Sequence, residues 1–333
     1  MSGGTAVPYN LRQNKHVERQ LFVDLLDCID RWHPLKDYLY VGFGGIYFED
    51  FKLLHSHFAM HKMLSIESQQ WVLPRQKKNI PYGCIDHDHC DSSEFTRTVG
   101  KYRDKYKADN LICWLDYASP TQLAAQLSDV KALLPSLVAN DILKVTLVAD
   151  PHTLATVPKA GEDIHEKRLE ILRQRLLGTQ FLPDGLTADQ VREETYPEVL
   201  LGSFQRVVAE AMKESSSLIF QPVGSYVYKD TTQMLTLTGI VLEKTQLDSF
   251  IGQTGLKTFD LAGLDWRLQH INVPDLSLRE KLLLDGTIFK KTPGEIEAAM
   301  GFKLDEDAED SIRMIESYVK FYRYYPNFHR VVV

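Results

Sequence analysis

Residues 37–67, DYLYVGFGGIYFEDFKLLHSHFAMHKMLSIE, decide the fold of this chain. A short apolar run at residues 39–41 is followed at once by glycines at 42, 44 and 45. Phenylalanine and leucine then recur every three to four residues as far as Phe58, which is typical of one face of a helix. A second apolar run, residues 63–66, ends on Glu67. The stretch therefore predicts a strand, a glycine turn, a helix and a second strand.

This unit also carries the first candidate site residues. Glycines let the backbone turn tightly and approach a ligand with no Cβ in the way. A carboxylate at the end of the following strand can accept both hydroxyls of a ribose. Gly42, Gly44, Gly45 and Glu67 are therefore candidates for binding an adenosine-like ligand. The competing interpretation is a tight turn without a ligand, next to a surface glutamate.

Further strands extend the same pattern. Residues 111–115 and 142–148 are continuous apolar runs, as expected for central strands buried on both faces. Residues 80–85 predict another strand, which ends at Asp86. Helical segments between these runs give a repeated strand–helix order, the pattern of a parallel sheet covered by helices. Right-handed crossovers place the loops after all strands along one edge, where we expect Gly42, Glu67, Asp86 and Asp116.

The expected fold is α/β: a Rossmann-like, seven-stranded, mostly parallel sheet with an antiparallel terminal hairpin and a helical C-terminal part. The hairpin is predicted from β-rich runs at 218–229 and 234–242. Three regions follow: residues 1–36 as an N-terminal leader and helix, residues 37–244 as the Rossmann-like domain with a helical insertion at about 151–197, and residues 245–333 as a helical subdomain.

Composition limits the class of protein. The chain has 333 residues, a net charge of −7, and 44% hydrophobic and 25% charged residues, as in ordinary globular proteins. The acidic balance disfavours a surface that binds nucleic acid through bulk charge. No apolar run reaches the roughly 18 residues of a membrane helix, and the first residues lack a signal-peptide pattern. Four irregularly spaced cysteines do not form a disulfide framework. We expect a cytoplasmic protein.

The order of strand, glycine turn, helix and strand ending in Glu67 resembles that of the class I S-adenosylmethionine-dependent methyltransferases. A later strand ending in Asp116-Tyr-Ala-Ser-Pro and the closing hairpin add to the resemblance. More narrowly, the chain is similar to a divergent O-methyltransferase group that carries a Tyr-x-Leu-Arg-x-Asn-Lys stretch, here at residues 9–15. The resemblance covers roughly residues 9–244.

The resemblance implies S-adenosyl-L-methionine as the cofactor and assigns roles to individual residues. The glycines would approach the methionine part of the cofactor, and Glu67 would hold the ribose. Asp116 would face the sulfonium as the catalytic residue, either as a general base or to orient the acceptor. The remaining assignments are Asp86 at the adenine, Arg12, Asn14 and Lys15 over the cofactor carboxylate, and Tyr117, Ser119 and Pro120 in the substrate loop.

Two departures from the family pattern keep other functions open. Tyr40 stands where an acidic residue is expected, and Ile46 replaces the third glycine. The leading hypothesis is methyl transfer to a small molecule or protein, with nucleic acid disfavoured as the acceptor. The alternative is a catalytically weak, methyltransferase-like binding or scaffold subunit of an oligomer or larger complex. A nucleotide-binding oxidoreductase is a third hypothesis, against which the closing hairpin argues.

Some polar and aromatic clusters favour a structural interpretation. Residues 84–91 contain cysteine, histidine and aspartate, which are metal-ligand types. Alternating residues of a strand point to opposite faces, however, and no second spaced pair follows, so no metal site is expected. His57 and His61 lack the glutamate of a zinc-protease helix. The aromatic and basic residues 318–326 are interpreted as a C-terminal helix that packs by its apolar stripe, in preference to a nucleic-acid surface.

Overall fold

A computed structural model describes residues 12–157 and 161–326 of the chain. These residues form two compact units. Unit 1 comprises residues 23–227 and 232–269. Within the described part of the chain, unit 2 brings together residues 12–22, 228–231 and 270–326.

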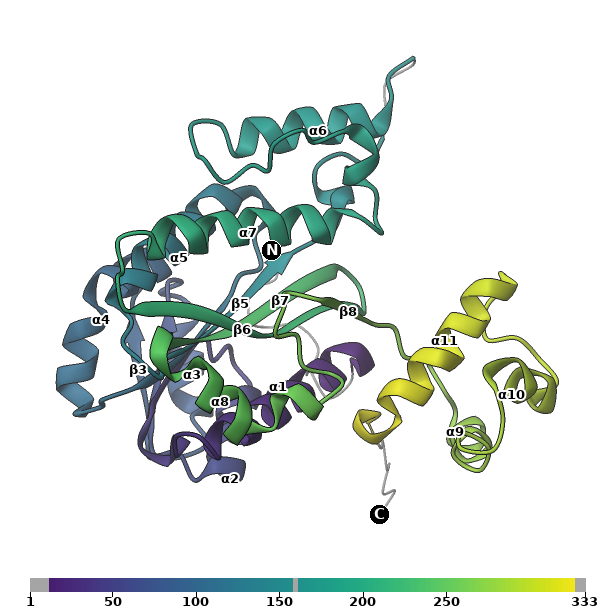
Figure 1. The fold of residues 1–333 in the computed structure, drawn as a ribbon, viewed down its shortest axis with the longest axis horizontal. Coiled ribbons are helices and arrows are strands. Elements are labelled where there is room, and N and C mark those ends of the chain that lie inside the picture. Colours follow the sequence, from purple (N-terminus) through teal and green to yellow (C-terminus); the bar gives the residue numbers. More distant parts are fainter. Residues whose placement is uncertain (1–11, 158–160, 327–333) are drawn as a thin grey trace. The chain divides into compact units, whose positions relative to one another are not determined.

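The sheet has eight strands in the order β3-β2-β1-β4-β5-β7-β6-β8 (Figure 1). The first five strands of this order are parallel to one another, and β7 is antiparallel to β5. The predicted mostly parallel sheet with an antiparallel end is therefore confirmed. The strands are β1 Leu39–Gly42, β2 Lys62–Glu67, β3 Ile85–His89, β4 Leu111–Asp116, β5 Ile142–Val148, β6 Leu218–Lys229, β7 Gln233–Glu243 and β8 Leu268–Ile271.

Two strand predictions need correction. Within residues 12–157 and 161–326 the sheet has eight strands instead of the seven expected, because the four-residue strand β8 lies in the region expected to be only helical. With two apolar residues in Leu-Gln-His-Ile, this strand is too short for a clear pattern. The strand expected at residues 80–85 is wrong as well, since β3 begins only at Ile85 and ends at His89.

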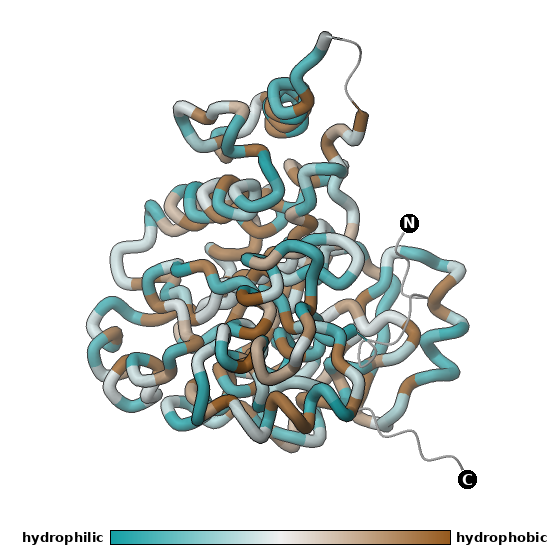
Figure 2. Tube along the Cα trace, turned by 90° about the vertical axis from the view of Figure 1, so that its right-hand side faces the viewer, coloured by the Kyte–Doolittle hydropathy of each residue, from teal (hydrophilic) through white to brown (hydrophobic). Residues whose placement is uncertain are grey.

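Helices cover both faces of the sheet in unit 1. On one face, strand side chains such as Val41, Cys113 and Val145 form one apolar cluster with residues of α4, α5 and α7. On the other face, the ring of Tyr40 lies 4.8 Å from that of Phe51 in α2. Hydrophobic and hydrophilic stretches alternate along the trace (Figure 2). The helices are α1 Gln13–Asp30, α2 Glu49–Phe58, α3 Leu73–Asn79, α4 Ser92–Tyr106, α5 Leu123–Leu133, α6 Ile164–Arg175, α7 Tyr196–Met212 and α8 Leu247–Thr254.

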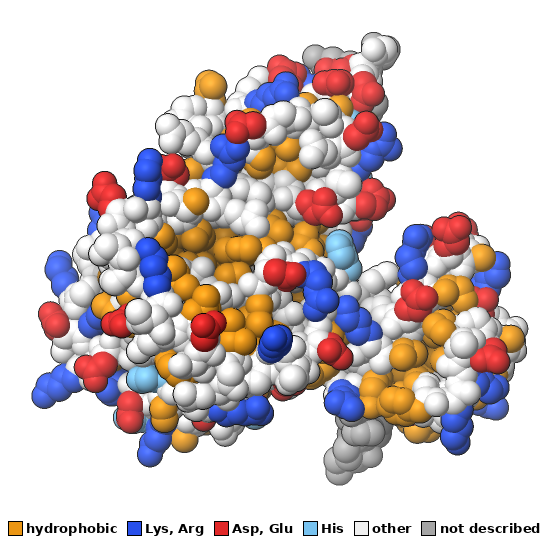
Figure 3. All heavy atoms as spheres, viewed as in Figure 1, with side chains coloured by type: hydrophobic (Ala, Val, Ile, Leu, Met, Phe, Trp, Pro, Cys, Tyr) orange, Lys and Arg blue, Asp and Glu red, His pale blue; other side chains and the backbone are white. Residues whose placement is uncertain are grey.

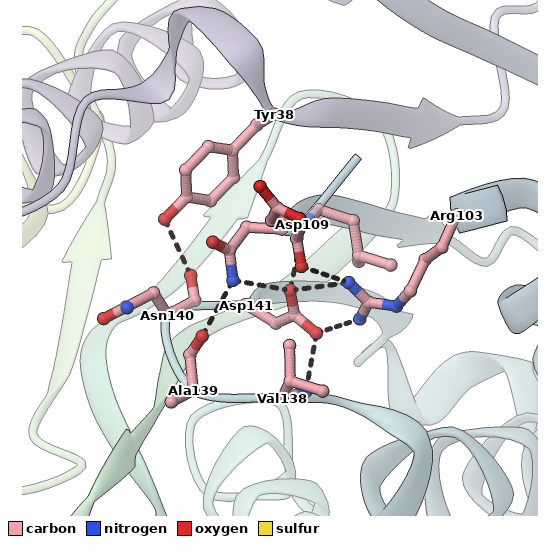
Figure 4. Close-up of polar contacts among 9 residues, drawn as sticks. Tyr38, Arg103, Asp109, Val138, Ala139, Asn140 and Asp141 are labelled. Carbon is pink, nitrogen blue, oxygen red and sulfur yellow. Dashed lines mark hydrogen bonds and ion pairs between the residues drawn. The ribbon is translucent and has the colours of Figure 1, made fainter. Parts of the chain in front are cut away.

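A buried ionic cluster joins α4, β4 and β5 at the amino ends of these strands (Figure 4). Asp141 is fully buried, and its carboxylate forms an ion pair with Arg103. It also accepts hydrogen bonds from the backbone N–H groups of Leu111, at 2.9 Å, and Val138, at 2.8 Å. Because each carboxylate oxygen has protein donors, the buried charge is compensated.

Unit 2 contains α9 Leu278–Asp285, α10 Pro293–Met300 and α11 Ala308–Phe321. Helices α9 and α10 both begin with capping boxes, formed by Ser277 with Glu280 and by Thr292 with Glu295, and Gly301 ends α10 with a φ of 78°. Tyr318 is fully buried and donates a hydrogen bond of 2.6 Å to Asp285, which supports the structural interpretation of the C-terminal aromatic residues. Leu282 and Phe289 are 62% and 79% exposed, and hydrophobic side chains are visible on this unit in Figure 3.

Candidate functional site

The carboxyl ends of β1, β2, β3 and β4 lie along one edge of the sheet. The register pairs Gly42 with Ser65 and with Trp114, and it pairs Glu67 with His89. The chain therefore leaves these four parallel strands at neighbouring places. We call this edge the carboxyl edge; it comprises Gly42–Gly45, Glu67, residues 89–91 and residues 116–120.

The glycine turn packs closely against the second strand. The N–H of Gly44 donates a hydrogen bond of 3.1 Å to Oγ of Ser65. A Cβ at Gly44 would lie 2.6 Å from that oxygen and 2.7 Å from a ring carbon of Phe48. Gly45 has a φ of 54°, in the left-handed region that favours glycine. The sequence of this turn is thus explained by contacts within the protein, whether or not a ligand approaches it.

Glu67 ends β2 and lies partly buried at the carboxyl edge. One carboxylate oxygen accepts the N–H of Gln69 at 2.8 Å, and the other accepts Nε2 of Gln76 at 3.2 Å. Burial raises the pKa of Glu67, although the backbone donors and nearby His89 act to lower it. The carboxylate is therefore held in one orientation and is partly shielded from water.

Asp86 does not lie where the sequence predicts. It is the second residue of β3 and pairs with Leu64, three residues before the end of β2 at Glu67. At about 3.3 Å per residue, this places it roughly 10 Å short of the carboxyl edge. Its carboxylate accepts a hydrogen bond of 2.6 Å from the hydroxyl of Tyr106. The prediction that Asp86 ends the third strand is wrong, and Asp91 follows that strand instead, as the N-cap of α4.

The metal-ligand types around β3 are dispersed in the structure. His89 contacts the carbonyl oxygen of Ser68 at 3.1 Å, and Sγ of Cys84 lies 3.6 Å from Nδ1 of His55. Within residues 12–157 and 161–326, no three histidine, cysteine or acidic side chains converge to hold a metal ion.

The loop after β4 is held at several points. Asp116 is partly exposed, whereas Tyr117 is buried and its ring centroid lies 6.1 Å from that of Phe43 in the glycine turn. The carbonyl oxygen of Ser119 accepts Nε2 of Gln126 at 2.6 Å. The carbonyl oxygen of Pro120 accepts a hydrogen bond of 3.0 Å from Arg175. The loop is thus anchored through its backbone and through Tyr117, while Asp116 remains at the carboxyl edge.

Asp129 of α5 is a site-supporting residue that the sequence predictions missed. Its Oδ2 accepts hydrogen bonds from Oγ of Ser92, at 2.6 Å, and from the hydroxyl of Tyr117, at 3.2 Å. Burial raises the pKa of Asp129. One carboxylate therefore links the segments that follow β3 and β4. Gln126 and Asp129 interrupt the apolar face formed by Leu123, Leu127 and Leu133, and this pattern could have revealed both residues.

Asn14 and Lys15 belong to unit 2. The Asn14 side chain donates to the carbonyl oxygen of Lys229 at 2.9 Å and accepts the N–H of Val273 at 2.8 Å. The carboxylate of Asp230 accepts the backbone N–H groups of Asn14 and Lys15, each at 3.0 Å. Asn14 thus has a structural role in joining the segments of unit 2. Its binding of a cofactor stays a prediction, as do those of Lys15 and Arg12.

The strand order, the antiparallel β7 and the glycine turn define a methyltransferase-type Rossmann-like domain. The family model described as "Putative O-methyltransferase" matches residues 7–333, and the chain belongs to this family. The family membership predicted from the sequence is therefore confirmed.

Solved structures with a similar fold were also found. The match to Trm1 from Pyrococcus horikoshii, in complex with S-adenosyl-L-methionine, has a TM-score of 0.40 and 14% identity, and it covers 71% of this chain and 57% of Trm1. The N-methyltransferase NodS from Bradyrhizobium japonicum WM9 has a TM-score of 0.36 and 10% identity, with 68% and 97% of the two chains covered. The plantazolicin methyltransferase BamL, in complex with SAH, has a TM-score of 0.39 and 9% identity, with 67% and 85% covered.

No curated protein matches the chain. Within the part of the chain that the structure describes, no helix is both long enough and apolar enough to span a membrane.

Proposed function

We propose that this protein transfers a methyl group from S-adenosyl-L-methionine to an oxygen atom of a small-molecule or protein acceptor. The observation that carries the proposal is the meeting of a glycine turn, an acidic strand end and a second carboxylate on three adjacent strands. Gly42, Glu67 and Asp116 end β1, β2 and β4 at the carboxyl edge. Family membership supports transfer to oxygen.

The residues at the carboxyl edge suit the proposed cofactor chemically. The glycine turn offers backbone with no Cβ, and Glu67 offers a carboxylate oriented by Gln69 and Gln76. Such a carboxylate can accept both hydroxyls of a ribose. In our proposal Gly42, Gly44 and Gly45 approach the methionine part, and Glu67 holds the ribose.

When bound, S-adenosyl-L-methionine would supply an electrophilic methyl group to the acceptor oxygen and would be released as the neutral thioether SAH. A hydroxyl acceptor loses its proton, for which we propose Asp116 as the base or orienting group. Tyr117, Ser119 and Pro120 belong to the anchored loop beside it and are proposed to shape the acceptor site. In-line positioning of the acceptor contributes most of the rate acceleration in this view.

The test of this proposal is calorimetric titration with S-adenosyl-L-methionine, its demethylated product SAH, and NAD. We expect a dissociation constant on the order of micromolar for the first two ligands and no binding of NAD. Glu67→Ala should weaken binding at least tenfold, or about 1.4 kcal/mol. Asp86→Ala is the matched control, because Asp86 is exposed and lies away from the carboxyl edge. An equal loss of affinity for S-adenosyl-L-methionine in both variants, or no binding by the wild type, contradicts the proposal.

A second candidate function is a methyltransferase-like binding or scaffold subunit. Two observations favour it: Tyr40 occupies the place of an acidic residue in the family pattern, and both oxygens of Glu67 already accept protein hydrogen bonds. This function requires binding of the cofactor or of a partner without turnover. Release of SAH over a panel of acceptors, abolished by Asp116→Ala, would exclude it.

A further inference from the structure

Helix α3 packs onto unit 1 through a polar side chain. Gln76 is fully buried, and it is the only buried residue of this helix. Its neighbours Arg75, Lys77 and Lys78 are exposed. A surface helix normally turns apolar side chains toward the protein, so a glutamine at this position indicates a specific contact.

The amide of Gln76 forms a hydrogen bond through its nitrogen only. Its Nε2 donates a hydrogen bond of 3.2 Å to Oε2 of Glu67. Its Oε1 is buried and has no hydrogen-bond partner within the described residues. A buried acceptor without a partner lowers the stability of the folded protein. Methionine has a similar shape and would avoid this loss, so packing alone does not explain the glutamine.

The donors around Glu67 leave an acceptor position on each of its oxygens. Oε1 accepts the backbone N–H of Gln69, and Oε2 accepts the amide of Gln76. An ionised carboxylate offers about two acceptor positions on each oxygen, so each oxygen can accept one more hydrogen bond. Glu67 is only half-buried, and residues 68–70 beside it are exposed, so this strand end is accessible from solvent. Two adjacent oxygens with one such position each match the two neighbouring hydroxyls of a ribose.

We infer that Gln76 is a positioning residue, which holds the carboxylate of Glu67 so that it selects a ligand with both ribose hydroxyls. This inference rests on the proposed function, because it concerns specificity at the same site. The terminal torsion of a glutamate side chain is soft, and the N–H of Gln69 holds only one of the two oxygens. Without Gln76 the carboxylate can rotate, and its contact with one of the two hydroxyls is lost.

The test compares SAH with its 2′-deoxy analogue by calorimetric titration of the full chain. The two ligands differ by one hydroxyl group. We expect the wild type to bind SAH about tenfold more tightly or better, because a hydrogen-bonding site rejects an analogue that lacks the hydroxyl. Gln76→Met keeps the volume of the side chain and removes the donor. It should reduce the preference for SAH to about threefold or less and leave the affinity for the deoxy analogue unchanged.

Two further measurements separate a positioning role from a role in the fold alone. In a Glu67→Ala background, Gln76→Met should cause no further change in the preference for SAH, because the carboxylate that it positions is absent. Gln76→Glu puts an acceptor in the place of the donor, so it should weaken SAH binding more than Gln76→Met does. Lys77→Met, on the exposed side of α3, is the matched control and should keep the wild-type preference.

The inference is overturned if the wild type binds both ligands equally, or if Gln76→Met keeps the preference for SAH. It is also overturned if Gln76→Met weakens the binding of both ligands by the same factor, since that result shows a role in the fold alone. If Gln76→Met unfolds, Gln76→Glu takes its place, and an unchanged preference in that variant overturns the inference. Failure of the wild type to bind SAH would contradict the proposed function, and this is a separate readout from the preference between the two ligands.

Discussion

At the scale of single residues, two carboxylates border the candidate site, one partly buried and one buried. They differ in the hydrogen-bond donors that they accept. Glu67 accepts a backbone N–H and an amide, whereas Asp129 accepts two hydroxyls on one oxygen. Burial raises the pKa of both groups. Ionisation of each carboxyl group therefore lowers the stability of the folded protein. Both groups nevertheless orient neighbouring donors around the site.

Glu67→Gln should raise or preserve the stability of the protein without ligand. Because the folded-state pKa of Glu67 is raised, its contribution to stability is fully present below the unfolded value of about 4.3 and is lost as the pH rises through the folded value. At pH 7 the variant should thus unfold at an equal or higher temperature than the wild type, and the difference should shrink at acidic pH.

The same variant should bind S-adenosyl-L-methionine at least tenfold more weakly. Thermal unfolding at pH 4 and pH 7, together with calorimetry, measures both effects. A variant that is less stable at pH 7 and binds normally would contradict the assignment of Glu67 to the ligand.

Asp129→Asn and Asp129→Leu should differ sharply in their free energy of unfolding. The asparagine keeps an oxygen for the hydroxyls of Ser92 and Tyr117, and it resembles the neutral acid that burial favours. We expect a change in unfolding free energy of within about 1 kcal/mol. Leucine leaves the buried hydroxyl of Tyr117 without its acceptor, which costs about 1–3 kcal/mol. Urea unfolding followed by tyrosine and tryptophan fluorescence measures both variants, and equal losses would show that the hydroxyl contacts are unimportant.

At the scale of secondary-structure elements, the glycine turn shows how a strand end and a helix start are fitted together. Phe48 caps α2 with a φ of 53°, and Gly44 lies against its ring. A side chain at Gly44 would displace both Ser65 and Phe48, and the geometry of the carboxyl edge depends on these contacts.

Gly44→Ala should destabilise the protein by about 1–3 kcal/mol and weaken binding of S-adenosyl-L-methionine, because the added methyl overpacks the turn. The matched control is Gly100→Ala, which lies exposed within α4 and has nothing within 4 Å of its Cβ position. The free energy of unfolding of that variant should rise by roughly 0.5–1 kcal/mol, the usual difference between glycine and alanine in a helix. Chemical unfolding and calorimetry of both variants provide the measurement.

The Asp141 cluster joins three elements at the opposite end of the strands. Asp141→Ala should cost about 3–5 kcal/mol, because it leaves Arg103 as an unpaired charge near the core and two backbone N–H groups without an acceptor. The folded fraction should bind S-adenosyl-L-methionine normally, since this cluster lies at the amino ends of the strands. A change in affinity with unaltered stability would contradict this division between structural and functional ends.

The sequence predicted the elements with strong periodicity and left the short ones uncertain. Residues 111–115 and 142–148 are buried on both faces, so their apolar runs were clear. β3, by contrast, reads Ile-Asp-His-Asp-His, and only Ile85 is buried. An edge strand of this kind carries no apolar alternation, and the prediction shifted it toward residues 80–85. Asp86 was misplaced as a consequence.

At the scale of the whole molecule, the candidate site was predictable where it follows from sheet topology. Parallel strands deliver their ends to one edge, which brought Gly42, Glu67 and Asp116 together from sequence alone. Asp129 could not be placed in this way. Its position on the apolar face of α5 marks it as unusual in the sequence, but its partner Tyr117 lies in the loop after β4, and the local sequence does not encode that contact.

Asn14→Ala should loosen unit 2 and leave unit 1 unchanged. The Asn14 amide donates to the carbonyl of Lys229 and accepts the N–H of Val273, so its removal leaves the buried N–H of Val273 and the partly buried carbonyl of Lys229 without this partner. The expected loss of unfolding free energy is about 1–3 kcal/mol for each unsatisfied group. Limited proteolysis should then cut first within residues 270–326. Asp184→Ala removes an exposed ion pair with Arg206 in unit 1 and serves as a control with little effect. Uniform cleavage of both units would contradict this prediction.

The pairing of Asn14 with residues 229, 230 and 273 also bears on how the protein is made. During synthesis, the amino-terminal turn of α1 emerges more than 200 residues before the carboxylate that caps it. Neither this turn nor unit 2 can reach its native contacts until residue 273 has left the ribosome, whereas the strands β1 to β5 are complete much earlier. Nascent chains in which residue 230 has not yet left the ribosome should therefore contain the parallel strands, whereas the first turn of α1 still lacks the carboxylate that caps it.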